Sequence, residues 1–214
     1  MIIVVGPVAA LDEPGDDALT PAGLTAAIAH AASAAGAGVE VVTRIGDDAA
    51  GDSVLLAFAA GGIGHVATLR DPAHPTLIVL AQADGADPDT GADTASDEPV
   101  APGGLAPSLD AADVGLALRY LADERVIVLV HAADPDITAE AVAAAGYAGA
   151  HLVLVTAPGE PPPGDLPPGA LVVEATDDAD GVAALVGRYA AAVDGGQDPD
   201  AAFEIMSAAA AADS

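Results

Sequence analysis

The chain has 214 residues, with 5 Lys and Arg against 33 Asp and Glu, a formal net charge of -28 and no Cys. This length suits a single domain with a buried core. The charge excludes nucleic acid and anionic membranes as partners, because both are polyanions. The lack of Cys excludes disulfides, thiolate nucleophiles and Cys-ligated zinc. No apolar run approaches the roughly 20 residues of a membrane span, so we expect a cytoplasmic protein without membrane contacts.

The acidic composition also indicates the solvent in which the chain folds. All five cations are Arg, Lys is absent, and Asp supplies 25 of the 33 acids. With so few cationic partners, the carboxylates repel one another unless salt screens them, and at about 1 M salt the screening length falls near 3 Å. The composition therefore favours a salt-rich, halophilic cytoplasm. A high-GC actinobacterium is the alternative, because its codon bias also enriches Ala, Gly, Asp and Pro.

Strands and helices alternate through the first half of the chain. We expect, in chain order, a strand over 1–6, a helix over 21–35, a strand over 39–45, a helix over 50–60, and strands of a hairpin or small sheet over 65–69 and 76–81. Gly61-Gly62 closes the second of these helices, as glycines past a helix end commonly do. Residues 83–107 are rich in Asp, Gly, Pro and Ser and are expected to form a flexible loop.

The same alternation continues in the second half. We expect a helix over 111–122, a strand over 126–130, a helix over 138–145, strands over 152–155 and 170–174, and two final helices over 180–193 and 199–211. A Pro-rich connector occupies 158–168. Strands that alternate with helices predict an α/β fold with a doubly wound, mainly parallel sheet and right-handed crossovers. We expect residues 1–214 to form one such domain.

Open α/β sheets place their sites at the carboxyl ends of the strands. The candidates at such ends are Gly6, residues 46–48, residues 131–134, Thr156 and residues 176–178. No phosphate-binding loop of the Walker type is present, since that motif requires Lys, and no glycine-rich dinucleotide motif follows a strand. His131 with Asp134 and Asp136 has a spacing loosely typical of metal ligands. A structural or solvated role is favoured over a functional one for His30, His65, His74 and His151, and over a metal site for His131.

Several motifs occur in a fixed order over residues 21–81. They are Pro21-Ala22-Gly23, the turn Gly46-Asp47-Asp48 with Gly51, the helix end Gly61-Gly62-Ile63 and the strand that begins at Pro75-Thr76. In this order they resemble the ribokinase-like (phosphofructokinase B) family of sugar and nucleoside kinases. A weaker similarity covers residues 109–158, and the tail over 195–212 resembles the last helices of that family.

The resemblance implies a Rossmann-like core with a small β-lid, formed here near residues 7–20 and 64–82. It also implies Mg²⁺ and ATP as cofactors if the chain is active, and a sugar, nucleoside or nucleotide as ligand. In such kinases the helix N-terminus holds the transferred phosphate, and an Asp in a Gly-Ala-Gly-Asp motif deprotonates the attacking hydroxyl. A homodimer through the lid is a further implication.

The chain departs from this family at the positions that carry the chemistry. Asp180-Gly181-Val182-Ala183 stands where the Gly-Ala-Gly-Asp motif is expected, so Ala183 replaces the base. An alternative alignment places the family's metal-associated Asn-x-x-Glu segment at residues 172–187, with the anion-hole region deleted. Ala27 stands at the position of the sugar-binding Asn, and Leu11 at that of an Asp, with Asp12 one place late. Losing a buried hydrogen bond costs about 1–3 kcal/mol.

On this resemblance we assign Asp12, Gly23 and Asp48 to the substrate, Thr176 and Gly181 to the nucleotide phosphate, Asp177 and Asp178 to a metal ion, and Asp180 to catalysis. Two of these assignments have structural alternatives: Asp48 caps the helix that follows it, and the aspartates near 180 are a solvated helix start. Three functions stay open. They are a degenerate homologue that binds a nucleotide or metabolite or regulates a partner, an active ATP-dependent carbohydrate kinase, and a non-catalytic homodimer.

Overall fold

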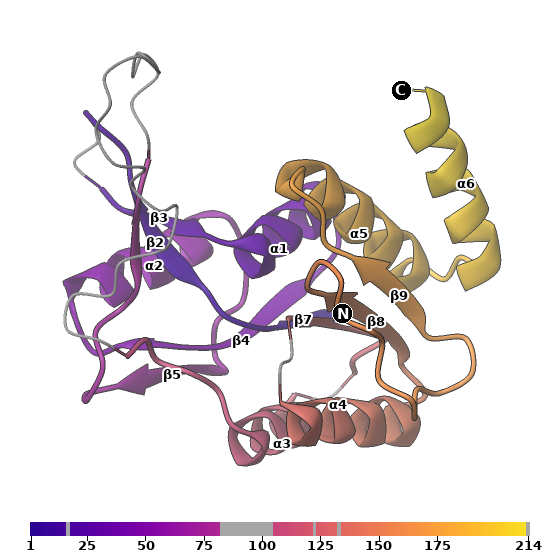
Figure 1. Cartoon of the computed structure of the whole chain (residues 1–214), viewed down its shortest axis with the longest axis horizontal. Helices are drawn as coiled ribbons and strands as arrows, with labels where there is room; N and C mark the ends of the chain where they lie inside the picture. The colour runs from indigo at the N-terminus through magenta and orange to yellow at the C-terminus, as the bar shows by residue number, and fades with distance from the viewer. Residues whose placement is uncertain (16–17, 82–104, 122, 132–133, 213–214) are drawn as a thin grey trace.

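The computed structural model describes residues 1–15, 18–81, 105–121, 123–131 and 134–212. A central sheet of six parallel strands has the order β5-β4-β1-β7-β8-β9, and a three-stranded sheet has the order β3-β2-β6 (Figure 1). The central strands are β1 (Ile2–Val5), β4 (Val39–Gly46), β5 (Thr68–Asp71), β7 (Val126–Val130), β8 (His151–Thr156) and β9 (Leu171–Glu174). The small sheet comprises β2 (Ala9–Asp12), β3 (Thr20–Ala22) and β6 (Ile78–Leu80).

The inner strands of the central sheet are apolar at consecutive positions because both faces of the sheet are covered. In β1, Ile2 and Val4 enter one core cluster, and Ile3 and Val5 enter the other. The first cluster packs beneath α1 (Leu24–Ala34), α2 (Ala49–Ala60) and α5 (Ala179–Asp194), while α3 (Ala111–Tyr120) and α4 (Pro135–Ala148) cover the second (Figure 1). The last helix, α6 (Pro199–Ala212), lies outside α5. The molecule therefore has three layers, with the helices sandwiching the sheet.

Small residues bring α1 and α5 unusually close together. A Cβ added to Gly187 would lie 2.6 Å from the Cβ of Ala31 and 2.8 Å from the backbone nitrogen of Ala32. No side chain larger than hydrogen fits at position 187 unless the two helices move apart. The abundance of Ala in both helices therefore has a packing role, which is to let their backbones approach.

The α/β class and the doubly wound parallel sheet are confirmed, and the strand expected over 126–130 is β7. The first helix begins at Leu24 rather than at residue 21, because Thr20–Ala22 pairs antiparallel with β2 instead. The small-sheet expectation is confirmed for residues 76–81, where β6 lies, but is wrong for residues 65–69. The strand in that region, β5, pairs parallel with β4 at the edge of the central sheet. Most of the loop expected over 83–107 lies outside the described residues.

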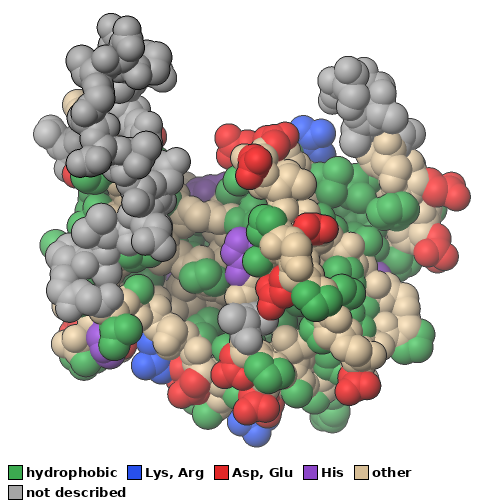
Figure 2. Space-filling view, viewed as in Figure 1, with side chains coloured by type: hydrophobic (Ala, Val, Ile, Leu, Met, Phe, Trp, Pro, Cys, Tyr) green, Lys and Arg blue, Asp and Glu red, His purple; other side chains and the backbone are tan. Residues whose placement is uncertain are grey.

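Acidic side chains are spread over the face of the molecule drawn in Figure 2, where Lys and Arg are sparse. Within the described part of the chain, no helix has the length and apolarity that crossing a membrane requires.

Candidate functional site

A cleft lies at the carboxyl ends of β1, β4 and β7, where an open α/β sheet is expected to place its site. It consists of two adjoining cavities of about 360 and 270 Å³, which share Pro7, Arg44, Pro107, Val130 and His131. One cavity, the α4 lobe, extends to Leu129 and Ile137. The other, the small-sheet lobe, extends to Gly23, Thr25, Leu77 and Val79. The walls are mostly apolar, so the few polar groups in the cleft decide which ligand it can hold.

Three polar atoms of the cleft residues are buried without a partner. They are the hydroxyls of Thr25 and Thr43 and Nε of Arg44, none of which has a hydrogen-bond partner among the residues that the structure describes. Both threonines are fully buried. A buried polar group without a partner is costly and is commonly satisfied by a ligand or an ordered water. Sequence reasoning missed both threonines, because β-branched residues at a helix start and in a strand are unremarkable.

Gly6 lies in the α4 lobe, close to Thr25 at the start of α1 and to Val130 at the end of β7. A Cβ at this position would lie 2.6 Å from Oγ1 of Thr25 and 2.9 Å from the carbonyl oxygen of Val130. Any larger residue would therefore push α1 away from the end of β7. The sequence marks Gly6 as a candidate, and the structure places it in the α4 lobe.

Arg44, which lines both lobes, is held by two carboxylates. Its Nη2 donates to the Asp113 carboxylate on the first turn of α3, and its Nη1 lies 4.0 Å from Oδ2 of Asp71. Asp113 also takes part in the capping box of α3. Hydrogen bonds from His74 and from the backbone of Ala73 lower the pKa of Asp71, against the opposing effect of its burial, so Asp71 stays ionised at neutral pH. The guanidinium charge is thus compensated within the protein.

His131 directly follows β7 and has a φ of 49°, which is rare for a residue other than Gly. Its backbone N–H donates to the carbonyl of Val155 at 2.8 Å, and its side chain is exposed at the mouth of the cleft. Desolvation lowers the pKa of its imidazole, and the Glu160 carboxylate opposes this shift. Asp134 caps α4 by accepting from the N–H of Asp136. Among the described residues no group of three or more His, Asp or Glu could hold a metal ion.

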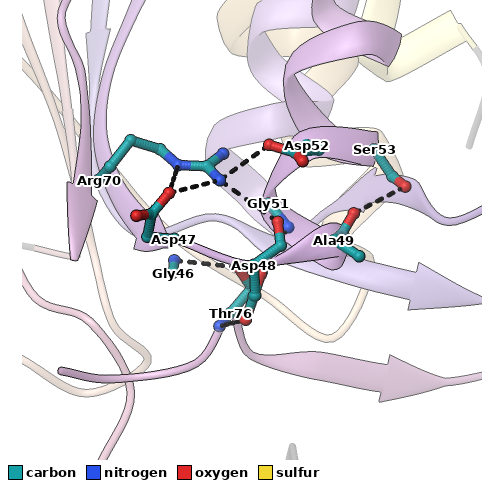
Figure 3. Close-up of polar contacts among 9 residues, drawn as sticks. All are labelled: Gly46, Asp47, Asp48, Ala49, Gly51, Asp52, Ser53, Arg70 and Thr76. Atoms are coloured by element: carbon teal, nitrogen blue, oxygen red, sulfur yellow. Dashed lines mark hydrogen bonds and ion pairs between the residues drawn. The ribbon is translucent and has the colours of Figure 1, made fainter. Parts of the chain in front are cut away.

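Asp48 joins helix α2 to the segment that enters the small sheet (Figure 3). Its Oδ1 accepts from the N–H of Gly51 at 2.8 Å and from Oγ1 of Thr76 at 2.7 Å, and its Oδ2 accepts from the N–H of Thr76 at 2.8 Å. The capping role is therefore confirmed. The substrate role stays a prediction, made on a carboxylate that already accepts three hydrogen bonds from Gly51 and Thr76.

The other two residues assigned to the substrate lie in different surroundings. Gly23 is the N-cap of α1 with a φ of 91°, which favours glycine, and it lines the small-sheet lobe of the cleft. Asp12 is exposed at the end of β2 and is not among the described lining residues. The structure thus brings Gly23, but not Asp12, to the cleft.

A separate groove of about 600 Å³ runs between α5 and α6. Thr176, Asp178 and Gly181 line one end, and Leu185, Ile205 and Met206 are among its apolar residues. None of its described lining residues is shared with the cleft.

The start of α5, at one end of this groove, is occupied by the chain's own carboxylate. Oδ1 of Asp178 accepts from the N–H of Gly181 at 2.9 Å. Asp177 and Asp180 are exposed, while Ala183, aligned with the base, is 3% exposed and belongs to the core. The Gly181 N–H, which the sequence assigns to the phosphate, is thus already engaged, and the buried Ala183 supplies no carboxylate base, so these residues do not fit a transferred phosphate beside such a base.

No family model and no curated protein matches the sequence. The fold is similar to that of a putative ribokinase II from E. coli in complex with ATP and Mg²⁺. This likeness has a TM-score of 0.68 and 12% identity over 96% of this chain and 89% of that chain. A fructokinase from Xylella fastidiosa with bound ATP has a TM-score of 0.52 and 16% identity over 96% and 64% of the two chains.

An uncharacterized sugar kinase from Pyrococcus horikoshii in complex with ATP has a TM-score of 0.54 and 13% identity over 72% of this chain and 52% of that chain. The chain therefore spans about half the length of that kinase. These likenesses confirm the architecture that the sequence motifs imply: the chain has the ribokinase-like carbohydrate kinase fold.

Proposed function

We propose that the chain is a degenerate homologue of the ribokinase-like sugar kinases, which binds a small metabolite or nucleotide without efficient phosphotransfer. One observation carries this proposal, namely the composition of the start of α5. The carboxylate of Asp178 engages the Gly181 N–H, and the position aligned with the catalytic base is the buried Ala183. A kinase needs the opposite arrangement, with free donors for the phosphate and a carboxylate beside the attacking hydroxyl.

Two cavities support ligand binding. Residues that line the cleft carry buried polar atoms without a described partner, and the α5–α6 groove offers apolar side chains near Thr176 and Gly181 for a flat ring such as a base. A ligand could bind in either cavity without the carboxylate base that phosphotransfer requires. Regulation of a partner and a structural homodimer through the small sheet are the readings that remain if neither cavity binds a small molecule.

The alternative is an active ATP-dependent carbohydrate kinase in which Asp180 acts as a displaced base. The likeness to a putative ribokinase II in complex with ATP and Mg²⁺ over 96% of this chain favours it. Asp180 lies on the first turn of α5 and is exposed. As a base it would require a substrate hydroxyl to approach α5 from the solvent side.

The test combines a binding measurement with a turnover measurement in about 2–3 M KCl, which screens the acidic surface. Thermal shift with Mg-ATP, Mg-ADP, sugars and nucleosides reports binding, since a ligand that binds only the folded state raises Tm. Transfer of the γ-phosphate of ATP to the same sugars reports turnover. We expect a saturable shift with at least one of these ligands and no transfer to any sugar. Transfer that Asp180→Asn abolishes would instead establish the kinase, and no shift with any ligand would refute both readings.

A further inference from the structure

We propose that the cleft selects an uncharged, compact and mostly apolar ligand that carries a hydroxyl or carbonyl group, and that the two-carboxylate clamp on Arg44 excludes anions such as sugar phosphates. This inference rests on the proposed binding function and names the ligand class of the cleft. It concerns the cleft alone and makes no statement about the α5–α6 groove.

The charge of the cleft carries the first step. Arg44 is the only Lys or Arg among the described lining residues of both lobes. Asp113 and Asp71 compensate its charge, and Asp134 at the mouth adds a further carboxylate. The described ionised groups thus leave an excess of negative charge. An anionic ligand would meet repulsion there, and the net charge of -28 of the whole chain adds to it.

The unpartnered atoms carry the second step. The hydroxyls of Thr25 and Thr43 can each donate and accept one hydrogen bond or more, and Nε of Arg44 donates. A ligand with a single hydroxyl or carbonyl can satisfy such atoms. Apart from Ser108, His131 and Asp134, the remaining lining side chains are apolar or Gly, so most other hydroxyls of a sugar would lack a partner. Binding of a polyol would therefore be weakened by the desolvation of hydroxyls that form no hydrogen bond in the cleft.

Matched probes test this selectivity. Benzyl alcohol and benzoate share a ring and differ in charge, and ribose supplies a polyol. Binding is followed by the methyl NMR signals of Thr25 and Thr43, assigned with Thr25→Ser and Thr43→Ser variants, at the lowest KCl concentration that keeps the protein folded. We expect benzyl alcohol to shift both signals saturably. Benzoate, ribose and inorganic phosphate should bind at least about tenfold more weakly.

Charge variants separate the clamp from the general acidity of the chain. Asp113→Asn frees Arg44 from one carboxylate and should tighten benzoate binding by about tenfold, while benzyl alcohol changes little. Glu140→Gln removes the same charge from α4, outside the described lining of the cleft, and should change neither. If Asp113→Asn leaves benzoate binding unchanged, if benzoate binds the natural cleft as tightly as benzyl alcohol, or if no probe shifts the signals, the inference is overturned. None of these three outcomes would contradict nucleotide binding in the thermal-shift assay, so failure of this inference is distinguishable from failure of the proposed function.

The threonine hydroxyls give a readout that does not depend on any charge. Thr25→Val removes a buried hydroxyl without a described partner, so it should raise Tm by about 2–4 °C while weakening benzyl alcohol binding several-fold. Thr76→Val is the matched control, because its hydroxyl is bonded to Asp48 and Gly46, and it should lower Tm. A Thr25→Val variant that is destabilised like Thr76→Val would show that the hydroxyl is satisfied within the protein, which contradicts the inference.

Discussion

Replacing Asp48 by Ala should destabilise the protein more than replacing any other carboxylate near the surface. The side chain caps α2 through Gly51 and holds both the N–H and the hydroxyl of Thr76. Loss of an N-cap costs about 1 kcal/mol, and each hydrogen bond to an ionised group contributes about 1.5–3 kcal/mol. Because Asp48 is only half-buried, water can replace some of these hydrogen bonds in the variant. We therefore expect a loss of about 2–4 kcal/mol in the free energy of unfolding.

Urea unfolding followed by far-ultraviolet circular dichroism in about 2 M KCl measures the effect, since the chain has no Trp. Asp47→Ala is the matched control. It removes an adjacent carboxylate that pairs with Arg70 at the surface, and such a pair contributes less than about 1 kcal/mol. Thr76→Val tests the coupling, because its effect and that of Asp48→Ala should be less than additive in the double variant. Equal losses for Asp48→Ala and Asp47→Ala would refute the reasoning.

The same carboxylate gives a pH dependence with a defined sign. Burial raises the pKa of Asp48, but hydrogen bonds from Gly51 and Thr76 together with the charge of Arg70 outweigh it and leave the pKa below 3.8. Its stabilisation is therefore complete above pH 3.8 and is lost as the pH falls through the lower value of the folded state. The stability difference between the natural protein and Asp48→Asn should shrink in that acidic window and stay constant at neutral pH. A difference that grows on acidification would contradict this sign.

Three further outcomes follow from the structure. Gly187→Val should separate α1 from α5 and lower the free energy of unfolding by about 1–3 kcal/mol or more. Gly146→Ala, with open space at its Cβ, should instead stabilise α4 by a few tenths to about 1 kcal/mol. Equal effects of the two substitutions in chemical unfolding would refute the close contact between the helices. Raising KCl from about 0.1 to 2 M should raise Tm steadily, because the screening length falls from about 10 Å to below 3 Å, and a Tm that is flat or falls would refute charge repulsion as the main destabilising force. Tyr189→Phe should cost about 1 kcal/mol, since the Tyr189 hydroxyl lies 2.8 Å from Nε2 of His151, and an unchanged urea midpoint would show that this contact does not stabilise the fold.

Local patterns in the sequence predict much of this fold because their physical causes are local. The apolar run over 126–130 is typical of a strand buried on both faces, and Asp48 before Ala49 is a typical N-cap. The pairing of β5 could not be predicted in this way. Thr68–Asp71 is a short strand of mixed polarity, and whether it joins the edge of the large sheet or a small one depends on where β4 lies.

The candidate site shows the same division. Gly6 could be placed at the cleft from the sequence because it ends a strand, and Gly23 because it matches a family motif. The clamp on Arg44 could not, because Asp113 is 69 residues away along the chain and reads locally as part of a helix cap. The hydrogen bond from the Gly181 N–H to Asp178 could be predicted only as one of two alternatives, because an acidic helix start can serve as a solvated cap or as a metal site.

The close contact between α1 and α5 has a consequence for how the chain folds. Gly187 meets Ala31 across 156 positions of sequence (187 minus 31), and β1, formed by the first residues, is completed only when β7 pairs beside it. Contacts so distant in sequence slow folding, because a long loop must close before they form. During synthesis the part of α1 that packs against α5 therefore stays uncovered until α5 has left the ribosome. The dense carboxylates of the protein keep such incomplete chains apart by repulsion, so the charge that opposes folding also protects the unfinished chain from aggregation.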